Sequence, residues 1–141
     1  MVGLANDARV VQLVERAATL GLPFRWEHQV DDSRLRHLYV NSAFCVYPSL
    51  EEGFGLPVAE SLWHRRSCLC SGSGALGELA VGGGCLRVDT SDWRALRQGL
   101  YRLIHDLHLR QYLQQQIAQR RPRLWREVAL EWWIMVQAAQ P

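Results

Sequence analysis

Short apolar runs alternate along this sequence with segments of helical periodicity, and this alternation limits the fold more than any other feature. The predicted strands are residues 24–30, 43–49, 67–72 and 85–89. The predicted helices are residues 5–21 with Asn6 or Asp7 as cap, 31–42, a helix from Pro57, 90–106 with Ser91 or Asp92 as cap, 108–120 and 124–139. Strands that alternate with helices in this way predict βαβ units and a parallel sheet with helices on both faces. The expected fold class is α/β and Rossmann-like.

Some stretches carry more detailed expectations. Residues 43–49 are apolar enough to be buried on both faces of the sheet, and residues 74–84 predict a loop with one helical turn. In the helix over 90–106, the apolar positions form one stripe that should face the core: Trp93, Leu96, Leu100, Leu103, Ile104 and Leu107.

Composition limits the number of domains and the class of partner. The chain has 141 residues, of which 48% are hydrophobic, and this predicts one domain over 1–141 with a substantial core. The net charge of +2 does not indicate a general nucleic-acid binder. All sixteen basic residues are arginine, so no mechanism can take a lysine from this chain.

Four cysteines occur without a CxxC pair: Cys45, Cys68, Cys70 and Cys85. Cys68 and Cys70 lie one residue apart on a predicted strand, so their side chains should point to the same face. We expect reduced thiols that pack as small apolar groups, and no metal site. The sequence opens with no signal peptide and has no apolar run near the roughly 18 residues of a membrane span, so we expect a cytoplasmic protein.

The stretch SLEEGFGLPVAESL, residues 49–62, follows a predicted strand and leads into a helix. Ligands of open parallel sheets bind at the carboxyl ends of the strands, where this stretch lies. Gly53 and Gly55 permit a tight turn and a close approach of a ligand to the backbone. With Pro57 as the first helical residue, the amides of Val58 and Ala59 should be free, which suits a phosphate at the helix N-terminus.

The acids of this stretch suggest hydroxyl groups as further ligands. Glu60 shares a helical face with apolar residues: Leu56, Ala59 and Trp63. A carboxylate among apolar neighbours needs hydrogen-bond donors, and ligand hydroxyls can supply them. Glu52 precedes it by eight positions and can accept from a second set of hydroxyls. This order predicts a nucleotide sugar with its ribose at Glu60 and its hexose at Glu52; the alternative is that Glu51, Glu52 and Glu60 are solvated surface acids.

EGFGLPVAESL resembles the E-x7-E signature of the large retaining family of GT-B glycosyltransferases, glycosyl transferases group 1. The resemblance continues through residues 31–55, 77–113 and 124–133. It implies the C-terminal half of a GT-B fold. The sequence departs from the family at WHRRSC, residues 63–68, where members usually have a small residue, a glycine and a proline. We therefore expect the turn after the motif helix to be built differently, with a shift in strand 67–72.

The resemblance implies roles for individual positions. Glu52 is the implied catalytic residue, because it contacts the hydroxyls of the donor sugar, and Glu60 binds the ribose. The other implied donor-binding positions act through main-chain groups: Phe54 and Gly55 beside the sugar, Leu56 and Val58 at the diphosphate, Gln29 and Val30 at the base. The resemblance implies no cofactor and no obligatory metal, because positive charge and amide dipoles stabilise the leaving diphosphate.

The resemblance also implies a missing partner. Members of the family carry an N-terminal acceptor-binding domain, and then a first βα unit, before the point that corresponds to Met1. The sequence thus resembles a partial domain: an excised fragment, a truncated reading frame or half of a two-chain enzyme, with the acceptor domain acting in cis or in trans. The implied function is donor binding for retaining hexosyl transfer from a nucleoside diphosphate sugar, in synthesis of bacterial cell-surface polysaccharide or glycoconjugate. The alternative is a non-catalytic nucleotide-sugar-binding or interaction module.

The C-terminal segment leaves three interpretations open. Residues 110–126 contain five arginines and no acid, and the helix over 124–139 is rich in tryptophan. This pattern is typical of a basic helix followed by a helix that packs on a core. It also suits peripheral contact with the inner face of the membrane, or an exposed apolar face through which the chain forms homo-oligomers.

Overall fold

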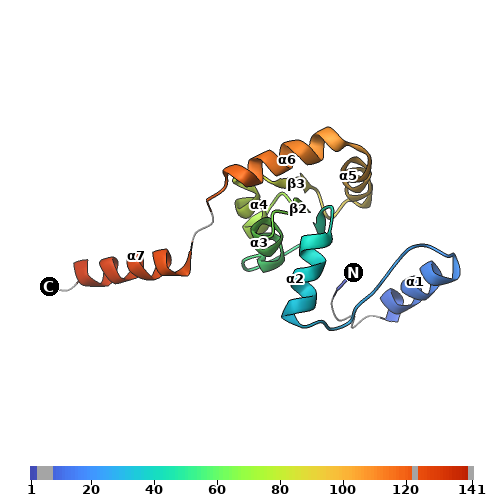
Figure 1. Cartoon of the computed structure of the whole chain (residues 1–141), viewed down its shortest axis with the longest axis horizontal. Helices are drawn as coiled ribbons and strands as arrows, with labels where there is room; N and C mark the ends of the chain where they lie inside the picture. Colours follow the sequence, from blue (N-terminus) through green and yellow to red (C-terminus); the bar gives the residue numbers. More distant parts are fainter. Residues whose placement is uncertain (3–7, 122–123, 140–141) are drawn as a thin grey trace. The chain divides into compact units, whose positions relative to one another are not determined.

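Figure 1 shows the computed structural model of the chain, which describes residues 1–2, 8–121 and 124–139. The structure divides into two compact units, Met1–Asn41 and Ser42–Pro141. These are called the first unit and the second unit below.

The first unit contains two helices, α1 (Ala8–Thr19) and α2 (Asp32–Asn41). The caps predicted for the first helix, Asn6 and Asp7, lie outside the described residues. Asp31 precedes α2 and its carboxylate accepts the Arg34 amide at 2.7 Å, as a residue at a helix N-terminus should. The chain between the two helices carries the Glu27 carboxylate, which pairs with the guanidinium of Arg34 at 2.8 Å to Nε and 2.5 Å to Nη2.

The strand predicted over 24–30 is wrong. In this segment only Glu27 pairs, in a single parallel bridge with Val2. A strand requires a ladder of such pairs, and one bridge does not provide it. The alternation of apolar residues also fails to bury the segment, since Phe24 is 46% exposed.

The second unit contains a parallel sheet of three strands in the order β1 (Cys45–Tyr47), β2 (Cys68–Ser71) and β3 (Cys85–Val88). Its helices are α3 (Leu56–Trp63), α4 (Gly74–Val81), α5 (Trp93–His105), α6 (Leu107–Gln119) and α7 (Trp125–Ala138). The order β1-α3-β2-α4-β3 consists of two successive βαβ units, so the Rossmann-like α/β fold class is confirmed.

Helices cover both faces of the sheet. Cys68 and Cys70 of β2 point to one face, where they form a core with residues of α3, α4 and the end of α6. Leu69 points to the other face and packs with Leu103 of α5 and Leu113 of α6. Each face therefore has its own hydrophobic core, and β2 is buried on both sides, as strands between two helical layers should be.

Of two predictions about the strands, the one on burial is wrong and the one on the cysteines is confirmed. The expectation that the run 43–49 is buried on both faces is wrong, because β1 is an edge of the three-stranded sheet and its Val46 is 39% exposed. The cysteines are free thiols, as predicted, and Cys68, Cys70 and Cys85 are buried. Burial is the main cause that raises the pKa of Cys68 to about 12, so this thiol stays protonated.

The helices differ from prediction in two places. Residues 74–81 form the helix α4 rather than one turn, because Leu76 and Ala80 pack into the core and outweigh the low helix propensity of glycine. In α5, the residues that pack on the sheet are Leu96, Leu100 and Leu103, as predicted. Three members of the predicted stripe are instead more than half exposed: Trp93, Ile104 and Leu107.

The turn after α3 is built without the glycine that such turns favour. His64 ends the helix, and Arg65 has a φ of 60°, in the left-handed region. The Arg65 amide donates to Leu62 O at 3.0 Å and the Arg66 amide to Ser61 O at 2.7 Å, which is the pair of bonds of a Schellman motif. Strand β2 lies within the predicted range 67–72, and its shift relative to other members of the family stays a prediction.

Candidate functional site

The loop after β1 is tied to its neighbours at the carboxyl edge of the sheet. Tyr47 is the last residue of β1, and its hydroxyl donates to Glu52 Oε1 at 2.5 Å. The hydroxyl of Thr90, just after β3, donates to the carbonyl of Ser49 at 3.3 Å. These two bonds connect the Glu52 side chain to Tyr47, which ends β1, and the start of the loop to Thr90, which follows β3.

Gly55 ends this loop and fits only as glycine. It is buried and has a φ of 81°, a conformation that side chains with a Cβ rarely adopt. A Cβ at this position would overlap Cδ2 of Leu76 in α4. The GFG portion of the motif therefore brings the backbone close to α4 and directs the chain into α3.

The start of α3 differs from the prediction by one residue. Leu56 is the first helical residue, so Pro57 occupies the second position. The amides of Val58 and Ala59 both donate to the carbonyl of Gly55, at 3.0 and 3.2 Å, so the prediction that they are free is wrong. As the first residue of α3, Leu56 has no carbonyl one turn earlier in the helix to accept from its amide, and an anion at this end of α3 would meet that amide.

Glu60 lies on α3, away from the buried face of the helix. Val58, Ser61 and Leu62 form that buried face. Glu60 is half-buried, while its predicted neighbours Leu56 and Trp63 are each 59% exposed. Both acids belong to the second unit, Glu52 in the loop before α3 and Glu60 within α3. Phe54, between them, is 60% exposed.

Gln29 and Val30 lie in the first unit, between α1 and α2. Gln29 is exposed and Val30 is half-buried. Their assignment to the nucleotide base stays a prediction, as do the ligand contacts assigned to Glu52, Phe54, Gly55, Leu56, Val58 and Glu60.

A cavity of about 520 Å³ lies at the carboxyl ends of β2 and β3. Its lining residues are Ser71, Gly72, Ser73, Arg87, Val88 and Asp89. Hydrogen bonds from the Ser91 hydroxyl and amide lower the pKa of Asp89 from its ordinary value, so this wall of the cavity carries a negative charge at neutral pH. The sequence analysis missed these residues, which lie in the last residues of β2 and β3 or directly after them, as the loop at 49–55 follows β1.

The described part of the chain contains neither a group of residues arranged to bind a metal ion nor a helix that could span a membrane. No group of three or more His, Cys, Asp or Glu side chains among these residues has the geometry to hold a metal ion. None of the described helices combines the length and apolar character needed to cross a bilayer.

A parallel α/β sheet with helices on both faces, and with a glycine loop and a helix N-terminus after its first strand, defines a domain of the Rossmann-like class. Residues 1–106 match the family model for glycosyl transferases group 1. The chain belongs to this family, so the resemblance to glycosyl transferases group 1 is confirmed.

The chain is similar to the O-antigen chain mannosyltransferase B of Escherichia coli. The two are 35% identical over 101 residues, which cover 72% of this chain and 26% of that protein. The chain thus spans about a quarter of the length of the curated relative that it matches.

Proposed function

We propose that this chain binds the donor in a retaining hexosyl transfer from a nucleoside diphosphate sugar, in the synthesis of bacterial cell-surface polysaccharide. Membership of the glycosyltransferase family and similarity to an O-antigen mannosyltransferase support this proposal. Because the chain corresponds to about a quarter of that relative, an acceptor-binding domain acts with it in cis or in trans.

The observation that carries the proposal is that one carboxylate lies in the loop that leads into α3 and a second lies on α3 itself. Glu60, half-buried on the helix, accepts hydrogen bonds from the ribose hydroxyls. Glu52, held by Tyr47, accepts them from the hexose, beside the backbone of Phe54 and Gly55. The diphosphate lies between them.

The main chain at the start of α3 holds this diphosphate. The Leu56 amide donates to it, and the partial positive charge at the helix N-terminus adds to the attraction. Val58, whose amide is bonded within the helix, contributes through that helix dipole rather than through a bond of its own. Gln29 and Val30 contact the base. Positive charge and amide dipoles stabilise the leaving group, so the reaction requires no cofactor and no metal from this chain.

Titration calorimetry with nucleoside diphosphates tests the assignment of Glu60. Replacing Glu60 by alanine removes hydrogen bonds between a carboxylate and two hydroxyls, which should weaken binding about ten- to a hundredfold. Glu51→Ala is the control, because Glu51 is an exposed acid of the loop before α3 and its replacement should not change the affinity.

Two results would contradict the proposal. Equal affinity of the Glu60→Ala variant and the unchanged chain would remove the ribose assignment. Saturation-transfer NMR that detects no contact between the unchanged chain and any of a panel of nucleoside diphosphates and nucleotide sugars would remove donor binding as a whole.

A further inference from the structure

The hydroxyl of Tyr47 contacts a carboxylate to which the proposed function gives a role in sugar binding. It donates to Glu52 Oε1 at 2.5 Å, a short distance of the kind found when the acceptor is charged. The two residues differ in how firmly they are held. Tyr47 belongs to strand β1 and packs against the core under α3 and α4, whereas Glu52 lies in a loop next to Gly53.

The bond from Tyr47 restricts Glu52 without using up its capacity to bind a ligand. A carboxylate has two oxygens, with about four acceptor positions between them. The Tyr47 hydroxyl occupies one position on Oε1, so Oε2 and the remaining position on Oε1 can still accept from sugar hydroxyls. A glutamate side chain that is already oriented loses less conformational entropy when a ligand binds.

We infer that Tyr47 is a positioning residue, which holds the Glu52 carboxylate in the orientation that receives the hydroxyls of the donor hexose. The inference rests on the proposed function and names a second residue of the same site. It makes β1, rather than the glycine loop alone, the element that fixes the hexose end of the donor.

The protonation state of Tyr47 agrees with this role. Its hydrogen bond to Glu52, with burial and the negative charge of Glu52 as smaller causes, raises the pKa of Tyr47 to about 12. The hydroxyl therefore stays protonated and remains a hydrogen-bond donor at neutral pH.

The test compares a nucleoside diphosphate with the matching nucleotide hexose by titration calorimetry. The probes are GDP with GDP-mannose and UDP with UDP-glucose, and the pair that the unchanged chain binds more tightly is used. Tyr47→Phe keeps the ring and removes the hydroxyl. It should weaken binding of the nucleotide hexose about three- to tenfold and leave binding of the nucleoside diphosphate unchanged. Tyr101→Phe, at an exposed tyrosine of α5, is the matched control and should change neither affinity.

A double-mutant cycle separates positioning from a structural effect. If Tyr47 acts through Glu52, both single variants, Tyr47→Phe and Glu52→Ala, should bind the nucleotide hexose more weakly. The double variant should lose no more affinity than Glu52→Ala alone. Additive losses would overturn the inference. The inference would also be overturned if Tyr47→Phe lowered the affinity for both ligands equally, because that result indicates a disturbed fold. An unchanged affinity of Tyr47→Phe for the nucleotide hexose would overturn it as well. Absence of binding by the unchanged chain is a different result and counts against the proposed function.

Discussion

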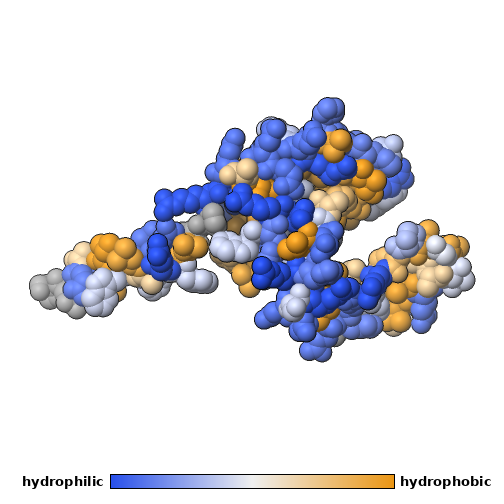
Figure 2. Space-filling model, in the orientation of Figure 1, coloured by the Kyte–Doolittle hydropathy of each residue, from blue (hydrophilic) through white to orange (hydrophobic). Residues whose placement is uncertain are grey.

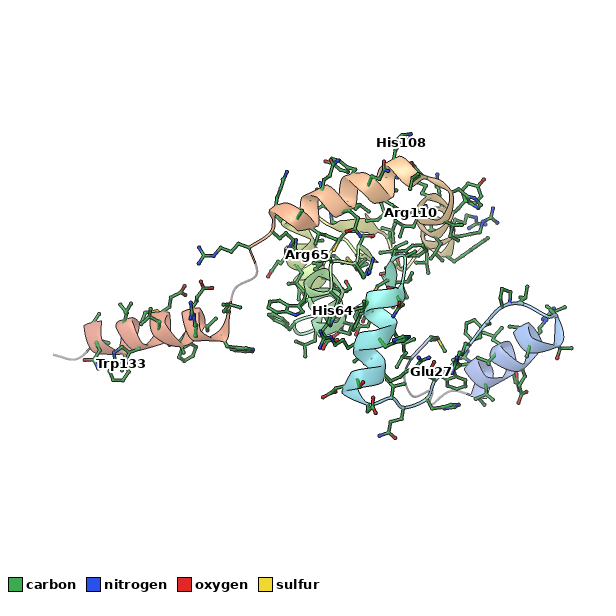
Figure 3. All side chains as sticks on the ribbon, viewed as in Figure 1. Glu27, His64, Arg65, His108, Arg110 and Trp133 are labelled. Carbon is green, nitrogen blue, oxygen red and sulfur yellow. The ribbon has the colours of Figure 1, made fainter. Side chains whose placement is uncertain are left out.

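At the residue scale, Arg65 carries a conformation that its side chain disfavours. It is the one non-glycine residue with a positive φ in the described part of the chain, and it occupies the position of a Schellman motif where glycine is common. Its Nη1 reaches the carbonyl of Ile117 at 3.4 Å, which is a long bond. Figure 3 shows Arg65 next to His64, at the end of α3.

Replacing Arg65 by glycine should therefore stabilise the chain. Relief of the left-handed backbone is worth roughly 1 kcal/mol and should exceed the loss of the long bond to Ile117. The midpoint of urea unfolding should rise. Arg66→Gly is the control: no positive φ occurs at Arg66, so glycine there should lower stability by about 0.5 to 1 kcal/mol. A lower midpoint for Arg65→Gly than for the unchanged chain would contradict this account of the turn.

The residues of the candidate site differ in how well the sequence predicts them. Glu52, Gly55 and Glu60 are predicted from local spacing, because a strand, a glycine turn and a helix follow one another there, and their ligand roles stay a prediction. Tyr47 does not, because a tyrosine in an apolar run is a normal core residue and only the fold of the loop brings Glu52 to its hydroxyl. Arg87 and Asp89 escape prediction for a similar reason: they meet Ser71 and Ser73 only where β2 and β3 pair.

At the element scale, one aspartate joins α5 to α6. The Asp106 amide donates to Arg102 O at 2.8 Å, which ends α5, and its carboxylate accepts the Leu109 amide at 2.9 Å, which begins α6. Arg110, labelled in Figure 3, donates to the last carbonyls of α5, those of Leu103 and Ile104. Two helix ends within a few residues thus satisfy their backbone groups locally.

Asp106→Ala should destabilise the chain by about 1 kcal/mol, because the first turn of α6 loses its side-chain acceptor. Asp106→Asn keeps an oxygen acceptor in the same place and should cost less. Urea unfolding followed by circular dichroism measures both variants. If alanine and asparagine proved equally harmful, the effect would come from the lost charge rather than from the cap.

The second prediction at this scale concerns the pH dependence of the pair between Glu27 and Arg34 of α2. The hydrogen bond from Arg34 lowers the pKa of Glu27 below its ordinary 4.5. A carboxylate with a lowered pKa stabilises the folded state above its ordinary pKa, and this stabilisation disappears as the pH falls through the lowered value. The Glu27–Arg34 pair should therefore open only below about pH 4.5.

The Nε–H resonance of Arg34 reports on that pair in NMR spectra. It should move as the pH is lowered through this range, and Glu27→Gln should abolish the transition. A resonance that titrates at or above the ordinary glutamate pKa would show that the pair does not form in solution.

The elements themselves are predicted well where local signals and packing agree. Asp92 was one of two candidate caps of α5, and it accepts the Arg94 amide at 2.9 Å. The failures are places where distant residues decide. At Gly77 in α4, a Cβ would lie 2.5 Å from the carbonyl oxygen of Gly72, so close packing explains a glycine that the sequence suggests is a helix breaker. Residues 24–30 alternate like a strand, but among the described residues their one ladder partner is Val2.

At the scale of the whole molecule, the helices of the second unit differ in how far they are buried. Those next to the sheet each contribute buried residues, whereas α7 has none. Apolar side chains recur three and four residues apart along α7: Trp125, Val128, Ala129, Trp132, Trp133, Met135 and Val136. Figure 2 shows apolar side chains at the surface of this helix, and Trp133 is labelled in Figure 3.

This exposed stripe predicts self-association. Trp132 and Trp133 are 66% and 63% exposed, and contiguous apolar surface of this kind is removed from water when two copies meet. Sedimentation velocity should show an average mass that rises with protein concentration. Because burial of a large apolar side chain is worth roughly 1.5 to 3 kcal/mol, replacing both tryptophans by serine should weaken association at least about tenfold.

The control for this prediction is Trp93→Ser, which removes an exposed tryptophan from α5 and should leave association unchanged. A constant monomer mass at all concentrations would contradict the prediction, and so would association that persists in the double variant.

Sedimentation with vesicles of anionic lipid distinguishes the membrane interpretation of the same segment. If the tryptophans bind the bilayer interface, the unchanged chain should pellet with the vesicles and the double variant should not. If they bind a second copy, neither protein should pellet. The charges of the segment favour the second outcome, because Arg121 pairs with Glu127 and Arg120 donates to the carbonyls of Leu79 and Gly83, which leaves fewer arginines for lipid headgroups.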